Sequence, residues 1–291
     1  MNENNLEANE KRKNISLHPC FNREASGNER IHLPIAPNCN IQCNYCVRKF
    51  DCINESRPGV VSEILTPHEA TRRYIEVKKN RPKLAVVGIA GPGDALANFE
   101  EVKETIMLIR QLDPDVTFCL STNGLMLPFY ANHLISIGVT HVTVTVNTVN
   151  ANTGAKIYNH ITYLGKVYKG EEGASILLQN QLSGIRYLTS MGIIVKVNIV
   201  LMKGINESEI SDIVSTMKQC GCDITNIMQQ ILVKGSAFEN KEIVEKSTLN
   251  YIRKACESIL PQMYHCKQCR ADAIGTLEND CSSEYLHCGK L

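Results

Sequence analysis

Three cysteines with the spacing C-x3-C-x2-C, Cys39, Cys43 and Cys46, follow the apolar run of residues 31–36. A 4Fe-4S cluster usually takes four cysteines, so a loop that supplies three would leave one iron open to bind and activate a small molecule. A zinc knuckle or a set of buried thiols is the plainer alternative, but zinc motifs favour two separated C-x2-C pairs. The spacing therefore predicts a catalytic iron–sulfur cluster, with these three cysteines as its ligands.

Further side chains that could bind iron, mostly cysteines, lie before, within and after the expected barrel. Cys266 and Cys269 form a C-x2-C pair after the last expected helix, which alone would indicate a zinc half-site or a redox pair. Three more thiols outside the first motif are those of Cys20, Cys52 and Cys119. These five thiolates are too few to ligate two further 4Fe-4S clusters completely. The side chains that could make up the difference are His32, Glu55 and His18, unless the clusters share a ligand.

Several of these residues also have a purely structural interpretation. Cys20 taken alone is a small buried hydrophobe. His32 could be a hydrogen-bonded core histidine, and Glu55 could lie in a solvated loop. The cysteines in or just after expected helices, which we expect to pack, are Cys220, Cys222 and Cys256. Two cysteines in the polar tail, for which both interpretations stay open, are Cys281 and Cys288.

Length and composition exclude several classes of protein. The chain has 291 residues and is 43% hydrophobic, which suits one α/β domain of barrel size. A net charge of +1, no tryptophan and 5% aromatic residues give no indication of nucleic-acid or anionic-membrane binding. The polar N-terminus lacks a signal-peptide core, and no run approaches the roughly 18 apolar residues of a membrane span. We expect a cytoplasmic protein, whose 13 cysteines serve as metal ligands rather than in disulfides.

Strand-like and helix-like segments alternate along the chain, which is typical of βαβ units around a parallel sheet. The expected strands cover residues 31–36, 84–90, 116–121, 141–146, 193–201 and 224–231. The expected helices cover residues 66–79, 98–112, 125–137, 174–191, 207–220 and 242–260. Residues 150–173 break this rhythm and are expected to form a structured insertion over the site. Six strands are fewer than the eight of a closed barrel. The pattern therefore predicts an α/β fold of the open, partial (β/α)6 barrel type, with N- and C-terminal extensions covering the open face.

The three-cysteine spacing, with Tyr45 before the last cysteine, resembles the signature of the radical S-adenosylmethionine (SAM) enzymes. Within that superfamily the chain resembles the NifB family of nitrogenase cofactor maturases, from about residue 17 to about residue 277. The segments that carry the resemblance are residues 18–20, 30–34, 39–46, 48–52, 54–59, 88–94, 120–124 and 265–273. The polar composition of residues 1–14 predicts a disordered arm. The resemblance implies the radical SAM domain at 15–277 and leaves residues 278–291 as a tail. Ala95 departs from the proline usual in the family, and the end at Leu291 leads us to expect a stand-alone form without the carrier-like domain of many relatives.

The resemblance also implies a reaction. In the superfamily the open iron chelates SAM, and one electron cleaves it to a 5'-deoxyadenosyl radical. NifB enzymes fuse two 4Fe-4S clusters into the carbide-containing 8Fe-9S-C precursor of the nitrogenase cofactor, with SAM as methyl donor and as radical source. The residues matched to SAM contacts are Gly91, Thr143, Asn147 and Ile199. Gly91 could instead serve only a tight turn, and Thr143 and Ile199 could simply pack the barrel. The implied partners are an iron–sulfur cluster donor, an electron donor and the assembly and carrier proteins of the nitrogenase cofactor.

Two other functions compete with this one. A different radical SAM enzyme, acting on a peptide or a tetrapyrrole, would carry its auxiliary cysteines mainly in a C-terminal extension. A non-catalytic iron–sulfur carrier would need neither a barrel nor an open iron. Here the cysteines lie before, within and after the expected barrel, which favours clusters held as substrates at its mouth.

Overall fold

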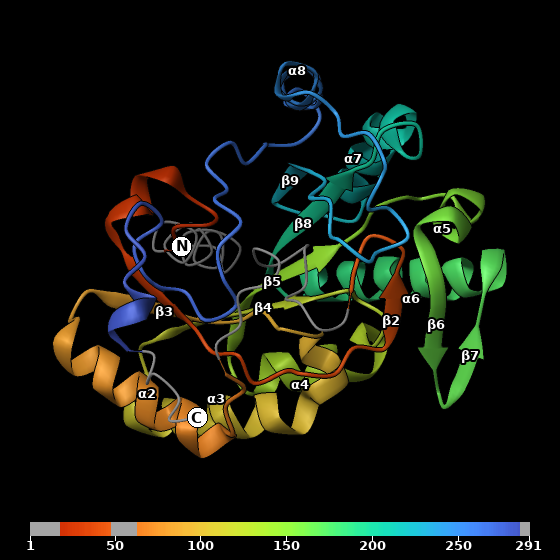
Figure 1. The fold of residues 1–291 in the computed structure, drawn as a ribbon. Coiled ribbons are helices and arrows are strands. Elements are labelled where there is room, and N and C mark those ends of the chain that lie inside the picture. Colours follow the sequence, from red (N-terminus) through yellow and green to blue (C-terminus); the bar gives the residue numbers. More distant parts are fainter. Residues whose placement is uncertain (1–17, 48–62, 286–291) are drawn as a thin grey trace, which may run out of the picture.

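The computed structural model describes residues 18–47 and 63–285. Within this part, a seven-stranded sheet has the order β10-β1-β3-β4-β5-β8-β9. β10 (Ile274–Gly275) runs antiparallel to β1, and the remaining neighbours are parallel. The six parallel strands are β1 (Glu29–His32), β3 (Leu84–Ile89), β4 (Thr117–Thr122), β5 (Val139–Thr145), β8 (Ile194–Leu201) and β9 (Ile224–Gln229). The sheet curls but ends at β9 and β10, so the predicted open barrel of six parallel strands is confirmed (Figure 1).

The helices lie outside the curve of the sheet, where they bury its outward side chains (Figure 1). They are α2 (Pro67–Asn80), α3 (Phe99–Leu112), α4 (Leu127–Ser136), α6 (Gly170–Ser190), α7 (Ile210–Gln219) and α8 (Lys246–Cys256). α2 begins as predicted, because Thr66 and Glu69 form a reciprocal capping box and Pro67 occupies the first turn. None of the helices in the described ranges is long and apolar enough to cross a membrane.

The insertion is structured, as predicted, and it supports the three-cysteine segment. α5 (Ala151–Ile157) leads into the hairpin of β6 (Tyr158–Tyr163) and β7 (Lys166–Tyr168). The prediction that all three cysteines lie in an irregular loop is wrong in one respect, because β2 (Ile41–Cys43) pairs antiparallel with β6. Local sequence does not reveal this strand, since its hydrogen-bonding partner lies more than 100 residues further along the chain.

The first parallel strand is also shorter than expected. β1 ends at His32 rather than at Ala36. Pro34 has no N–H to donate to a neighbouring strand, which explains why the ladder stops there. Ala36 still forms an isolated parallel bridge with Pro92, so the chain continues along β3 toward the cysteines.

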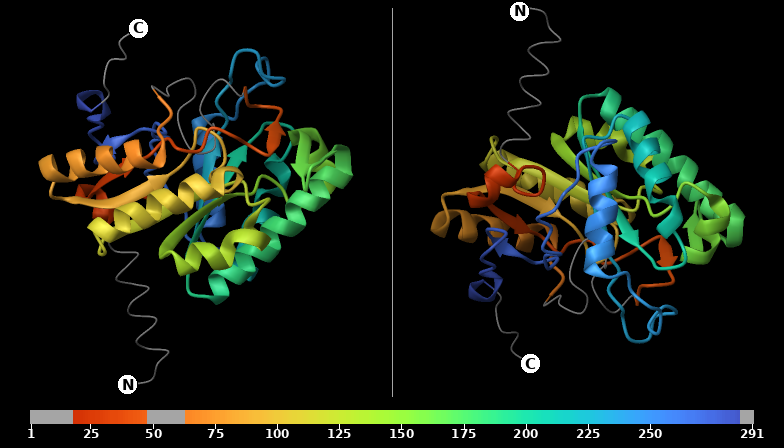
Figure 2. Two further views of the ribbon diagram at one scale, coloured as in Figure 1. Left: turned by 90° about the horizontal axis from the view of Figure 1, so that it is seen from below. Right: turned by 90° about the horizontal axis from the view of Figure 1, so that it is seen from above.

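Segments from near both ends of the described chain lie side by side at the β1 edge of the sheet (Figure 2). The ring nitrogen Nε2 of His265 lies 2.9 Å from the carbonyl oxygen of Pro19, and β10 pairs with β1. Arg81 binds Glu29 at 2.8 Å and Glu284 at 3.1 Å, which links the first strand to η4 (Ser282–Glu284). These contacts confirm the predicted terminal extensions over the open barrel.

Candidate functional site

Two histidines and a cysteine lie in one row across neighbouring strands of the sheet. His32 of β1 is in register with Gly88 of β3, Gly88 with Cys119 of β4, and Cys119 with His141 of β5. A Cβ atom on Gly88 would lie 2.8 Å from His32 Cδ2 and 3.3 Å from Cys119 Sγ. The glycine therefore leaves the space in which His32 and Cys119 approach each other.

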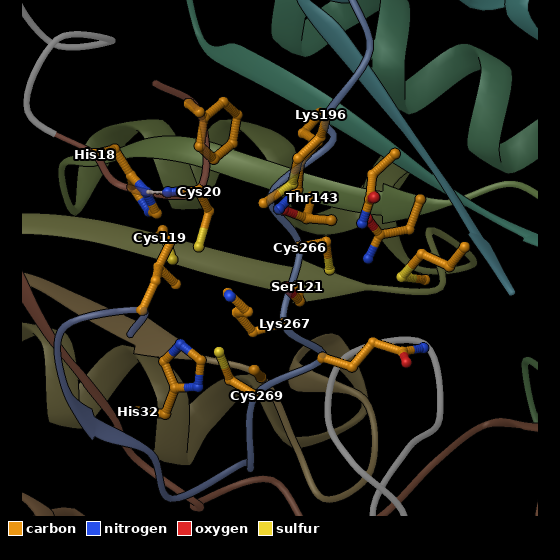
Figure 3. A pocket seen from close by; sticks show the side chains of 18 residues that line it. His18, Cys20, His32, Cys119, Ser121, Thr143, Lys196, Cys266, Lys267 and Cys269 are labelled. Atoms are coloured by element: carbon orange, nitrogen blue, oxygen red, sulfur yellow. Dashed lines mark hydrogen bonds between the residues drawn. The ribbon is translucent and has the colours of Figure 1, made fainter. Parts of the chain in front are cut away.

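The N-terminal segment, the strands and the C-terminal segment together line one opening, whose empty space is about 600 Å³. Figure 3 shows the predicted ligands around it. These are Cys20, Cys119, Cys266, Cys269 and His32. The predicted ligands Cys52 and Glu55 lie outside the described residues. The structure therefore brings together soft ligands from both chain ends and from the strands, although the ligand roles themselves stay predictions.

The ring of His32 is oriented by the C-terminal segment. Its Nδ1 lies 2.9 Å from the carbonyl oxygen of Arg270, which can only accept a hydrogen bond, so Nδ1 carries the proton. The lone pair of Nε2 is then available to a metal, which is the usual arrangement behind a ligating histidine. Burial lowers the pKa of His32 to about 4, which keeps the ring neutral near pH 7.

His18 is a poorer ligand by the same reasoning. Its Nδ1 accepts a hydrogen bond from the backbone N–H of Cys20 at 3.1 Å. In the neutral ring the proton then sits on Nε2, so neither nitrogen has a lone pair for iron. Burial lowers the pKa of His18 well below its ordinary value. Between the two histidines that the sequence left open, the geometry favours His32.

Sequence reasoning did not identify two buried cations: Lys196, which lines this opening, and Arg30, which contacts Cys269 of its lining. Arg30 donates hydrogen bonds to the carbonyl oxygens of Gly275 and Thr276 at 2.5 and 2.6 Å, and to Cys269 Sγ at 3.0 Å. Lys196 lies in β8, where all eight residues are buried. Burial raises the pKa of the Cys20 thiol, and the charges of Lys196 and Arg30 oppose that shift. A lysine inside a mostly apolar strand was the available sequence signal for Lys196, whereas the polar strand that carries Arg30 gave none.

The three-cysteine segment is fixed by a separate polar network. Asn123 Nδ2 donates to Asn40 Oδ1 at 2.7 Å and lies 3.9 Å from Cys39 Sγ. The Asp94 carboxylate accepts from the backbone N–H of Asn123 and from Thr122 Oγ1. Burial raises the pKa of Asp94, against the opposing effect of these hydrogen bonds. The turns after β3 and β4 are thereby tied to the segment that carries the cysteines.

The cysteines of that segment sit at the edge of a second apolar cluster. Cys43 is buried, whereas Cys39 and Cys46 are half-buried and pack against the cluster, as does Cys266. Asn147, which follows β5, donates from Nδ2 to the hydroxyl of Tyr45 at 2.8 Å. The first ligand set and part of the second therefore border the same apolar cluster.

The residues predicted to contact SAM have different surroundings. Gly91 has φ +141°, a backbone conformation that favours glycine, and it follows β3, where its carbonyl accepts a hydrogen bond from the N–H of Ala36. Thr143 lines the opening, whereas Asn147 is fully buried and also accepts from Val200 N at 2.9 Å. Ile199 packs in the main core, so it could reach SAM only through its backbone. All four contacts stay predictions.

Four further cysteines in the described part of the chain are buried, and Cys288 lies outside the described residues. The predicted packing role is confirmed for three that are buried in the main core, Cys220, Cys222 and Cys256. Cys281 is also buried, and its thiol lies 3.1 Å from the carbonyl oxygen of Ile274. Across residues 18–47 and 63–285, no three His, Cys, Asp or Glu side chains converge closely enough to hold a single metal ion. A 4Fe-4S cluster spreads its ligands over four irons, so a wider set of donors suits it.

The curled sheet of parallel strands and its outer helices form a partial barrel of the radical SAM type, and the chain belongs to the Radical SAM superfamily, whose profile matches residues 33–217. Among solved structures, Streptococcus suis SuiB bound to S-adenosylmethionine has a TM-score of 0.58 at 15% identity, covering 80% of this chain and 50% of that one. Methylornithine synthase (PylB) has a TM-score of 0.56 at 15% identity, covering 89% and 69%. At such low identity these structures show the shared fold alone.

Curated sequences give a more particular relationship. The chain is 47% identical over 275 residues to the FeMo cofactor biosynthesis protein NifB of Klebsiella pneumoniae, which covers 93% of this chain and 59% of that protein. It is 42% identical over 277 residues to NifB of Chlorobaculum tepidum, covering 94% and 65%. The predicted resemblance to NifB is confirmed, and the chain spans less than two thirds of the length of these relatives.

Proposed function

We propose that this chain is a radical SAM enzyme of nitrogenase cofactor biosynthesis, which fuses two 4Fe-4S clusters and one further sulfur atom from a separate sulfur donor into the carbide-containing 8Fe-9S-C precursor. SAM serves as methyl donor and as the source of the 5'-deoxyadenosyl radical. One observation carries the proposal: thiols from both chain ends and from β4 line a single opening, separate from the three-cysteine motif. An enzyme that needed only one catalytic cluster would have no use for this second set of soft ligands. The similarity to proteins named for FeMo cofactor biosynthesis supports the choice of product.

The catalytic cluster would be held by Cys39, Cys43 and Cys46. When bound, it supplies an open iron for SAM and the electron that cleaves it. The surrounding residues suit this role, because Asn123 lies against Cys39 and the fully buried Tyr45 is held by a hydrogen bond from Asn147. These contacts pre-organise the segment, so that the ligands need not be ordered when the cluster assembles.

The substrate clusters would be held at the opening by its soft ligands. These are Cys20, Cys119, Cys266, Cys269 and His32, with Cys52 and Glu55 as further candidates. Arg30 orients Cys269, and the carbonyl of Arg270 orients His32. Imidazole and carboxylate groups bind the iron of a cluster less firmly than thiolates do. A mixed set of these ligands therefore suits a cluster product that must leave the protein.

The proposal includes the division of the chain and its partners. We assign the arm to residues 1–14, the catalytic domain to 15–277 and the tail to 278–291. Within the described part of that tail, Cys281 and Tyr285 pack into the main core. The reaction requires an iron–sulfur cluster donor, an electron donor and a carrier or assembly protein that accepts the product, and it requires neither nucleic acid nor a membrane. The proposed location is the cytoplasm.

The test is iron per chain after anaerobic reconstitution, combined with SAM cleavage on reduction. The intact protein should hold about twelve irons, and a variant with Cys39, Cys43 and Cys46 replaced by alanine should hold about eight and cleave no SAM. Cys256→Ala, at a cysteine buried in the main core, is the matched control and should change neither value. About four irons falling to none would instead indicate a simpler radical enzyme.

Formation of the carbide needs its own measurement. With SAM labelled at the methyl carbon, the intact protein should place the label in the iron–sulfur product, and the triple-alanine variant should not. Labelled carbon that remains only in methylated by-products would contradict cluster fusion even if the iron content were as expected.

A further inference from the structure

Lys196 is a buried cation at the opening to which no role has yet been given. It lies in the middle of β8, is 7% exposed, and is in register with Thr143 of β5. Both residues line the opening with Cys20 and Cys266 (Figure 3). Its neighbours along the strand, Val195 and Val197, belong to the main core. Strand alternation therefore sends the lysine to the side of the ligands and away from the helices.

The ammonium group has no carboxylate to balance its charge within the described part of the chain. Its nearest described aromatic contact is the ring of Phe21, whose centroid lies 5.1 Å from Nζ. None of the described residues that line the opening is Asp or Glu. Arg30 of β1 is a second buried cation next to the opening, and its described partners are two carbonyl groups and Cys269, a residue of the lining. Buried charges are costly when unpaired, so the opening is built to receive an anion.

An iron–sulfur cluster ligated by thiolates is such an anion, because the thiolates and sulfides outweigh the charge of the irons. We propose that Lys196 is a substrate-binding residue, whose ammonium group holds an anionic iron–sulfur cluster in the opening through charge and N–H···S hydrogen bonds. This inference rests on the proposed function and deepens it, since it assigns a binding group that is not an iron ligand. An amine cannot ligate iron while it is protonated, so Lys196 leaves the product free to dissociate.

The test uses the full-length protein with the three-cysteine motif replaced by alanine, so that only the clusters at the opening are counted. In this parent we compare Lys196→Met, which keeps the length of the side chain, with Lys196→Arg, which keeps the charge. Lys218→Met, at an exposed position on α7, is the matched control. The probe is a ferrous chelator, whose uptake of iron is followed over time after anaerobic reconstitution.

Lys196→Met should release iron on the order of tenfold faster than the parent, as expected for the loss of one charge near a partly buried anion. Lys196→Arg should restore most of the retention, and Lys218→Met should match the parent. The reduction potential of the remaining clusters should move to more negative values in Lys196→Met only, because neighbouring charge and hydrogen bonds to sulfur set that potential. A role limited to packing would not produce this shift.

The cluster-free protein supplies the second measurement. Removing an unpaired buried charge should leave the unfolding midpoint of Lys196→Met unchanged or higher. A lower midpoint, or failure to fold, would mean that the lysine is structural and would overturn the inference. If the parent holds about eight irons and Lys196→Met releases them at the parental rate, the inference about Lys196 fails while the proposed function stands. A parent without iron would overturn the proposed function as well.

Discussion

Gly93 controls how closely the turn after β3 packs against the segment that leads into the three cysteines. Its N–H donates to the carbonyl of Ala36 at 2.5 Å, and the next N–H, that of Asp94, donates to Asn38 at 2.8 Å. A Cβ atom at position 93 would lie 2.1 Å from the Asn38 oxygen and 2.8 Å from the Ala36 oxygen. Both obstacles are backbone atoms, so Gly93→Ala cannot be accommodated by rotating a side chain.

The cost can be worked from this geometry. Real Cβ atoms essentially never approach closer than 3.0 Å, so the 2.1 Å contact must open by about 0.9 Å. Overpacking of this kind and the loss of the two hydrogen bonds together cost about 3 kcal/mol. For a domain of this size that corresponds to roughly 6–12 °C in unfolding midpoint. Because Asn38 precedes Cys39, the same shift should lower the rate of SAM cleavage about 100-fold.

Two assays separate these effects. Thermal unfolding of the cluster-free protein measures the packing cost, and SAM cleavage after reconstitution measures the displacement of the motif. Gly27→Ala is the matched control, since no atom lies within 4 Å of its added Cβ and it should behave as the parent in both assays. If Gly93→Ala matched Gly27→Ala in midpoint and cleavage rate, the close packing of this turn against the cysteine segment would be refuted.

Three further substitutions test other parts of the structure. Asn147→Ala removes the hydrogen bond to Tyr45, so it should lower the free energy of urea unfolding by about 2 kcal/mol and slow SAM cleavage. An unchanged rate of SAM cleavage would exclude a positioning role for Asn147. Arg30→Gln removes the contact with Cys269 and should speed chelation of iron from the opening, without affecting SAM cleavage; equal rates of iron loss would contradict this role. Thr66→Ala removes the capping box of α2 and should lower the free energy of urea unfolding by about 1 kcal/mol without changing the rate of SAM cleavage. An unchanged urea midpoint would contradict that value.

The repeating pattern of the sequence was enough to predict the barrel. Parallel strands buried on both faces read as nearly continuous apolar runs, as in β3, and helix starts carry local signals such as Thr66 and Pro67. These signals depend on nearest neighbours along the chain, so no tertiary contact is needed to recognise them. The short strands β2 and β10 have no such signal, because each exists only through pairing with a distant segment.

The sequence by itself determined the chemistry of this protein: the three-cysteine motif, the inventory of soft ligands and the resemblance to NifB follow from residue types and spacing. Only the tertiary structure decided which of those ligands meet. It brought Cys20 and Cys119 to the same opening as Cys269, favoured His32 over His18 through the partner of each Nδ1, and placed two buried cations among the thiols. The physical reason is that hydrogen-bond partners, burial and charge depend on chain segments up to 246 residues apart in the sequence, and only the folded sheet brings such segments together.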